Sequence, residues 1–111
     1  MNKEQVLLEH ITTEIRYIEE FTTNIDKEAF LRSVEKQHAV LRAIEIIGEA
    51  VKNLPISVTQ KYRSIRWKDI AGTRDILIHA YFSVDLNLVW SIVKIHIPEL
   101  KEAVTKALEC T

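Results

Sequence analysis

Residues 3–22 read KEQVLLEHITTEIRYIEEFT, and their apolar side chains return every three or four positions between charged ones. Those apolar positions are Leu7, Ile11, Ile15, Ile18 and Phe21. Steps of three and four residues keep side chains on one face of a helix, where they can pack against a neighbouring element. This segment therefore predicts a long amphipathic helix that ends near Thr22.

A second long helix is predicted from Asp26, which can act as its N-cap, to Asn53. Its buried face should carry Phe30, Val34, Leu41, Ile44, Ile47 or Gly48, and Val51. The helix cannot continue through Pro55, because proline lacks the amide hydrogen and disfavours helical geometry in the residue before it. Both predicted helices are long enough to frame a bundle.

Three further helical segments are predicted in the second half of the chain. A short one covers residues 57–65, beginning at its serine, and a substantial one covers residues 67–80. Ser83 or Asp85 caps the last segment, which should kink or restart at Pro98 before it continues.

The composition agrees with a globular, helical chain. Of the 111 residues, 47% are apolar and 28% are charged, with only two Gly and two Pro, so long helices with short connections are favoured. We expect an all-α fold, an up-and-down bundle of four to five helices that forms one domain over residues 1–111. The net charge of −1 argues against bulk electrostatic coating of nucleic acid but allows a local basic site.

The single cysteine, Cys110, cannot form an internal disulfide, which favours a reducing compartment. The first residues become charged before a signal-peptide core could form, and no apolar run approaches the ~18 residues of a membrane helix. His10, His38 and His96 lie on separate predicted helices and are more simply structural or surface residues. We expect a cytoplasmic protein with no membrane segment, no metal site and no cofactor.

Two helical segments carry more apolar surface than one partner helix covers. Residues 43–47 and 76–78 spread their apolar side chains around much of their helices. A homodimer interface would cover this surface, and so would a well-filled core within one chain. The pattern leaves both possibilities open.

Residues 74–81 are the segment most suggestive of chemistry, with the pattern Arg-x4-His-x-Tyr. Arg74 offers a rigid fork of donors to a phosphate, and His79 can move protons near neutral pH. In a straight helix Arg74 and Tyr81 align within about 20°, whereas Arg74 and His79 differ by about 140°. A shared site therefore needs the helix to end or loosen near His79, or a second copy of the chain to complete it. Asp75 can pair with either group or point to solvent.

A basic segment directly precedes this motif. It interleaves aromatic residues with four cations, which are Lys61, Arg63, Arg66 and Lys68. Such a mixture suits phosphate contacts and base stacking, although a solvated connector anchored by a tryptophan would look the same. Glu49, next to a mid-helix glycine, is either a site-supporting acid or a surface acid.

Together these residues resemble the HEPN superfamily, and more closely the HepT-type toxins of two-gene toxin–antitoxin systems. The resemblance covers most of the chain as an ordered set of segments. These are residues 42–50, 67–72, 74–81, 84–85, 89–90 and 97–100. The resemblance implies a helical bundle that forms a homodimer, with the Arg-x4-His-x-Tyr segments of two copies facing each other across a cleft.

The resemblance also implies a metal-independent endoribonuclease. Carried over to this sequence, Arg74 and His79 are the catalytic pair, and Asp75 helps to orient the site. We expect the ribose 2′-OH of RNA to attack the adjacent phosphorus, with His79 as general base or acid and Arg74 stabilising the phosphate charge.

In such systems the partner is a minimal nucleotidyltransferase antitoxin that can transfer AMP from ATP onto the motif tyrosine, here Tyr81. A bulky adenylate beside Arg74 would then turn the enzyme off. Two other hypotheses stand beside this one. The chain could be a non-catalytic helical dimer that binds nucleotide or RNA or docks a nucleotidyltransferase, or it could itself be the antitoxin.

Overall fold

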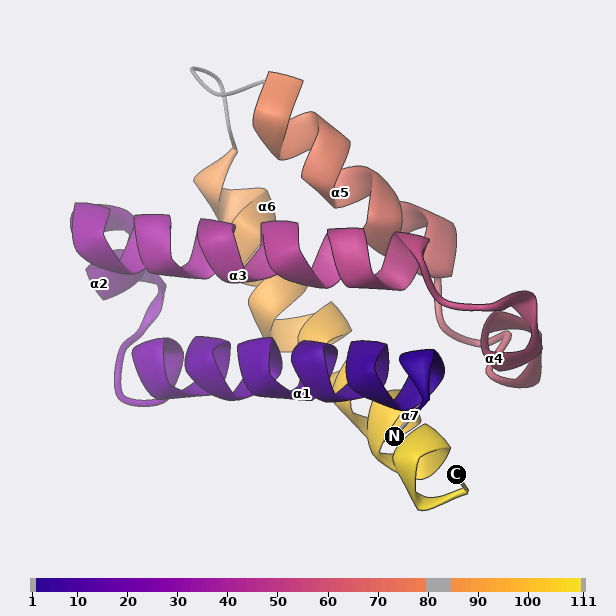
Figure 1. The fold of residues 1–111 in the computed structure, drawn as a ribbon. Coiled ribbons are helices and arrows are strands. Elements are labelled where there is room, and N and C mark those ends of the chain that lie inside the picture. The colour runs from indigo at the N-terminus through magenta and orange to yellow at the C-terminus, as the bar shows by residue number, and fades with distance from the viewer. Residues whose placement is uncertain (1, 80–84, 111) are drawn as a thin grey trace.

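The computed structural model describes residues 2–79 and 85–110, and for residues 74–79 it describes the backbone alone. Every regular element in this part of the chain is helical, which confirms the predicted all-α bundle (Figure 1). The elements are α1 (Lys3–Thr22), α2 (Lys27–Arg32), α3 (Val34–Lys52), α4 (Ile56–Lys61), α5 (Trp67–His79), α6 (Leu86–Ser91), the π-helix η1 (Ile92–His96) and α7 (Ile97–Glu109).

Helix α1 begins and ends close to where the periodicity predicts. Asn2 caps it: the Asn2 side chain accepts a hydrogen bond from the Gln5 amide at 2.8 Å, and the Gln5 side chain accepts one from the Asn2 amide at 3.2 Å. Its fully buried apolar side chains are Leu8, Ile11, Ile15 and Ile18. Leu7 and Phe21, predicted on the same face, lie at its edge and are only partly buried.

The predicted helix over residues 26–53 is wrong in one respect, because the chain leaves helical geometry at Ser33. Asp26 does cap the first piece, α2, by accepting from the Ala29 amide at 2.8 Å. Ser33 has an extended backbone, and its hydroxyl accepts from the Lys36 amide at 3.1 Å, which starts α3. Val34, predicted on the buried face, is consequently 63% exposed.

The short helix predicted over residues 57–65 differs at both ends, whereas one of the two predicted caps for the last segment is confirmed. The short helix α4 starts at Ile56, directly after Pro55, and ends at Lys61. Of the two candidate caps for the last segment, Asp85 takes this role: it accepts from the amides of Asn87 at 3.0 Å and Leu88 at 3.3 Å.

The predicted change of geometry at Pro98 is confirmed, and it takes the form of a π-helical turn. In η1 the Ile97 amide donates to the Ile92 carbonyl, five residues back. A proline ring would collide with the carbonyl of Lys94 in a regular α-helix, and the wider π turn relieves that crowding. The units α6, η1 and α7 therefore form one continuous rod. When this rod is counted as one unit, the described bundle has six helical units. The sequence predicted at most five, and the additional one arises because the predicted helix over residues 26–53 divides at Ser33.

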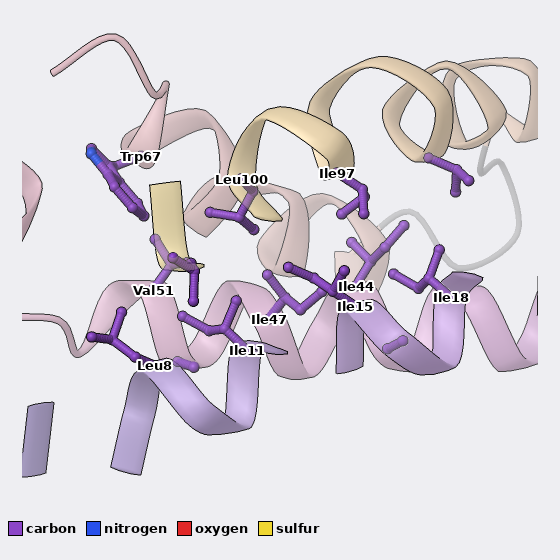
Figure 2. Packing of buried hydrophobic residues seen from close by; sticks show 14 of the residues in the cluster. Leu8, Ile11, Ile15, Ile18, Ile44, Ile47, Val51, Trp67, Ile97 and Leu100 are labelled. Atoms are coloured by element: carbon purple, nitrogen blue, oxygen red, sulfur yellow. The ribbon is translucent and has the colours of Figure 1, made fainter. Parts of the chain in front are cut away.

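The helices are arranged so that α3 lies between α1 and α5. In Figure 1, α1 and α3 run side by side in opposite directions, and α7 also packs against α1. Figure 2 shows Ile11 and Ile15 of α1 and Ile47 of α3 pointing into the same layer as Leu100 of α7. This shared core fixes α3, and α3 in turn positions α5.

Candidate functional site

Helix α5 carries the candidate motif and is anchored at its first residue. Trp67 is buried, and its indole Nε1 donates a hydrogen bond to the Tyr62 carbonyl at 2.9 Å. The Ile70 amide donates to the Arg66 carbonyl at 3.0 Å, so regular helical bonding begins at once. Because α5 also packs along α3, its N-terminal half has a fixed place in the bundle.

The backbone of α5 places three of the predicted site residues on one helix. Arg74 and Asp75 lie in its second half, and His79 is its last residue. Their side chains lie outside what the structure describes, and Tyr81 falls in the segment 80–84, also outside it. The helix keeps its geometry from Trp67 to His79, so it does not loosen between positions 74 and 79.

The basic segment forms an exposed connector between α4 and α5. Lys61, Arg63, Arg66 and Lys68 are all exposed. Arg66 is engaged with Asp69, at 2.9 Å from Nε to Oδ2, but its side chain remains 72% exposed. Lys61 lies over the Tyr62 ring, with 5.8 Å from Nζ to the centroid. The four predicted RNA-contact residues are thus exposed in the stretch that runs from the end of α4 into the first turn of the motif helix, α5.

Glu49 lies on the exposed side of α3, in the wall of a pocket of about 330 Å³ between α1 and α3. The Asn53 side-chain amide donates to the Glu49 backbone carbonyl at 2.8 Å and reaches its carboxylate at 3.4 Å. His10 and Arg42 also line this pocket. A supporting role for Glu49 toward the motif remains a prediction, because it depends on side chains of α5 outside the described part.

His10, Arg42 and Glu45, which line this pocket, were given no functional role in the sequence analysis, and the charges of His10 and Arg42 also act on Glu14 nearby on α1. Burial raises the pKa of the Glu14 carboxyl, and the charges of Arg42 and His10 only partly oppose that shift. Arg42 also pairs with Glu45, at 3.2 Å from Nη1 to Oε2. The sequence does indicate that His10 and Glu14 are neighbours, since they are four residues apart and border the apolar face of α1. This spacing alone does not predict a functional cluster, because ordinary surface pairs show the same spacing.

Among the described side chains, those of residues 2–73 and 85–110, no three of His, Cys, Asp or Glu come close enough together to hold a metal ion. None of the helices in the described part combines the length and apolar character needed to cross a membrane.

Comparison with known proteins gives a consistent result. A family model described as Ribonuclease HepT-like matches residues 11–107. A Thermococcus cleftensis protein named "Probable ribonuclease HepT" is 50% identical over 94 residues, which cover 85% of this chain and 86% of that protein. A Caldanaerobacter subterraneus protein named as a "Putative RNase" is 42% identical over 102 residues, covering 92% of this chain and 91% of that one.

A third relative is a longer protein. The Methanocaldococcus jannaschii protein named "Gamma-glutamylcyclotransferase and putative RNase" is 50% identical over 105 residues, which cover 95% of this chain but 47% of that protein. The chain therefore spans about half the length of this relative. No solved structure gives a significant match. The match over residues 11–107, the helical fold and the relatives together show that the chain belongs to the HepT-like ribonuclease family.

Proposed function

We propose that the protein is a metal-independent endoribonuclease whose catalytic pair is Arg74 and His79. The observation that carries this proposal is the placement of both residues on one regular helix, α5, directly after an exposed cationic connector. Membership of a ribonuclease family supports RNA as the substrate class. The connector supplies cations for phosphates on either side of the cleavage point.

The chemistry needs only groups of the protein and of RNA. A general base removes the proton from the ribose 2′-OH, the O2′–P bond forms, and the P–O5′ bond breaks. A general acid protonates the departing 5′ oxygen, which leaves a 2′,3′-cyclic phosphate and a free 5′-OH. His79 takes the base or acid role, and Arg74 stabilises the charge that grows on the phosphate oxygens. Asp75 and Glu49 support the orientation of this pair.

The same proposal includes its partners and its regulation. The protein acts as a homodimer and as the toxin of a cytoplasmic toxin–antitoxin pair, with a minimal nucleotidyltransferase as antitoxin. The Tyr81 hydroxyl would attack the α-phosphorus of ATP on that partner, releasing pyrophosphate and leaving an adenylate on the tyrosine. The new negative charge beside Arg74 would compete with RNA phosphate and stop cleavage.

The first test incubates the protein, produced without its partner, with total RNA in EDTA. We expect cleavage by the wild type and a loss of at least ~100-fold in His79→Ala, the size typical of a missing acid–base group. His38→Ala is the matched control, since it removes an exposed imidazole from α3. DNA of the same sequence should stay intact, because it lacks the attacking hydroxyl.

The outcomes separate this proposal from its alternative. Products that end in a 2′,3′-cyclic phosphate would support transesterification. RNA left intact by wild type and variants alike, with binding retained, would point instead to a non-catalytic helical dimer that binds RNA or docks a nucleotidyltransferase. Cutting of DNA at a comparable rate would exclude the 2′-OH mechanism.

A further inference from the structure

A groove of about 180 Å³ lies between α5 and the α6–η1 rod. Its walls are mainly apolar: Ile65 and Ile70 come from the connector and α5, and Leu88 and Ile92 come from the rod. Leu88 is apolar and yet 54% exposed, so the groove is open to solvent on that side. Such a hollow suits a flat ligand with apolar faces.

The polar groups of the groove lie around its rim and are mostly hydrogen-bond acceptors. Asp69 and Glu99 contribute carboxylates, and their side chains are 68% and 56% exposed. The Thr73 hydroxyl donates to the Ile70 carbonyl, so its oxygen is left to accept from a ligand. Arg66 supplies donors, but its Nε already engages Asp69 at 2.9 Å. The rim therefore favours a ligand that carries donors along its edge.

The groove is continuous with the cationic connector. Arg66 belongs to both, because it lines the groove and is one of the four exposed connector cations. The rim acids have partners that limit their repulsion of a phosphate: Asp69 pairs with Arg66, and the Glu99 carboxylate lies 3.9 Å from the His96 ring. An RNA strand whose phosphates lie on the connector would therefore bring a neighbouring base to the groove.

A nucleobase of single-stranded RNA combines the properties that this groove requires. Its faces can pack against aliphatic side chains, and its edge carries polar groups. A paired base is excluded, because its edge and faces are covered within a duplex. A helix of a protein partner is the competing occupant, but an apolar helix face would leave the rim acceptors unused.

The acceptors of the rim also discriminate between bases. Cytosine, adenine and guanine each carry an exocyclic amine, and carboxylates accept hydrogen bonds from such an amine. Uracil has carbonyl oxygens instead, and these would face the carboxylate oxygens of Asp69 and Glu99. The rim should therefore bind uracil least well.

We propose that this groove is a base-selecting subsite, which takes one unpaired, amine-bearing base of the RNA and discriminates against uracil. The choice of RNA as ligand rests on the proposed ribonuclease function, whereas selection of a base on binding does not require cleavage. Thr73 lines the groove and directly precedes Arg74, so the selected base would belong to a nucleotide near the cleaved bond.

The first test compares oligo(C) and oligo(U) RNA of equal length at neutral pH. The two have the same charge and ring size, and they differ in carrying an amine or a carbonyl on the base. The cleavage-deficient His79→Ala protein is titrated against each by fluorescence anisotropy. Oligo(C) should bind at least ~5-fold more tightly, which is the lower end of what one good base contact contributes.

The rim acids are tested through the ratio of these two affinities. Asp69→Asn combined with Glu99→Gln should bring the ratio close to one, because amides donate as well as accept. The ratio is the readout, since removing negative charge strengthens the binding of any RNA. Glu9→Gln combined with Glu109→Gln is the matched control: both residues are exposed and lie off the groove, so the ratio should stay unchanged.

The apolar wall is tested with Leu88→Ser, which should weaken the binding of both oligonucleotides without changing the mass of the protein in solution. Val34→Ser is the control, because Val34 is an apolar residue of α3 that is 63% exposed. A Leu88→Ser protein that changes in mass but binds RNA normally would assign the groove to a protein partner and overturn the proposal.

Two further arms separate the remaining outcomes. Free cytidine monophosphate should compete only at far higher concentration than oligo(C), because it lacks the neighbouring phosphates that the connector holds. Competition at similar concentrations would mean that the groove serves a free nucleotide, and would overturn the assignment to RNA. Equal affinities for oligo(C) and oligo(U), no binding of either, or a ratio that survives the change of both rim acids would overturn the subsite.

These results are distinct from failure of the proposed function. If RNA binds with the expected base preference but stays uncut by the wild type, the catalytic proposal fails and the subsite stands. If RNA is cut but neither bound nor cut with any base preference, the ribonuclease stands and the subsite fails.

Discussion

At the scale of single residues, Ser33 and Gln37 determine where the second long helix divides. The periodicity runs without interruption from Phe30 to Val51, so the sequence pattern alone favours one helix. Ser33 competes with that helix, because its hydroxyl can cap a new one. Gln37 then compensates for the break: its side-chain amide donates to the carbonyls of Phe30 at 3.0 Å and Leu31 at 3.1 Å.

The break has a packing consequence that the pattern could not reveal. It allows α2 to turn Phe30 fully into the core, where its ring lies 5.2 Å from the Trp90 ring, centroid to centroid. An aromatic pair of this kind adds to the stabilisation from burial. A contact between residues sixty positions apart depends on tertiary structure, and local sequence carries no signal for it.

Gln37→Ala should destabilise the protein by about 1–2 kcal/mol, because the carbonyls of Phe30 and Leu31 each lose a hydrogen bond, although the Ser33 amide still donates to the Phe30 carbonyl. Gln60→Ala is the control, since Gln60 is an exposed residue of α4. Urea unfolding followed by circular dichroism measures both variants. Equal unfolding midpoints for Gln37→Ala and the wild type would show that the side-chain bridge contributes nothing to stability.

At the scale of elements, the start of α5 was the most predictable part of the site. Trp67 begins the helix as the sequence indicates, and Asp85 begins α6 as one of two proposed caps. The helix bounds follow from local chemistry, namely a buried indole and an aspartate side chain at an N-terminus. The connector between α4 and α5 also lies on the surface with its cations exposed.

The connector should contribute electrostatically to RNA binding. In a His79→Ala background, which prevents cleavage, Lys61→Gln combined with Arg63→Gln should weaken binding of a single-stranded RNA. The slope of log K against log salt should fall by about 1.4, because each phosphate contact contributes about 0.7. Fluorescence anisotropy across a salt series measures this slope.

A matched control for the connector lies on α7. Lys101 and Lys106 are exposed, and each is paired with a carboxylate, that of Glu19 at 2.8 Å and of Glu102 at 3.1 Å respectively. Lys101→Gln combined with Lys106→Gln removes the same charge and should leave the slope unchanged. Equal slopes for the two double variants would mean that bulk charge, and not the connector, governs the binding of RNA.

At the scale of the whole molecule, the sequence predicts the fold class and the order of the helices but not the surfaces between them. The groove of about 180 Å³ between α5 and the α6–η1 rod joins Ile65 and Ile70 to Leu88 and Ile92, residues some twenty positions apart. The α1–α3 pocket joins His10 to Arg42 and Glu49. Periodicity assigns each side chain to a face of its own helix, whereas the angle at which two helices cross decides which faces border a hollow. The groove and the pocket could therefore be identified only from the structure.

The proposed homodimer has a consequence for dosage. If the motif segments of two copies form one cleft, as the family resemblance implies, an active centre exists only in the assembled pair, so at low abundance the quantity of active centres grows with the square of the number of chains. Halving synthesis would then lower RNA cleavage by about fourfold. If the protein is the ribonuclease proposed above, traces of it would cut little RNA, while a modest increase in production would raise cleavage steeply.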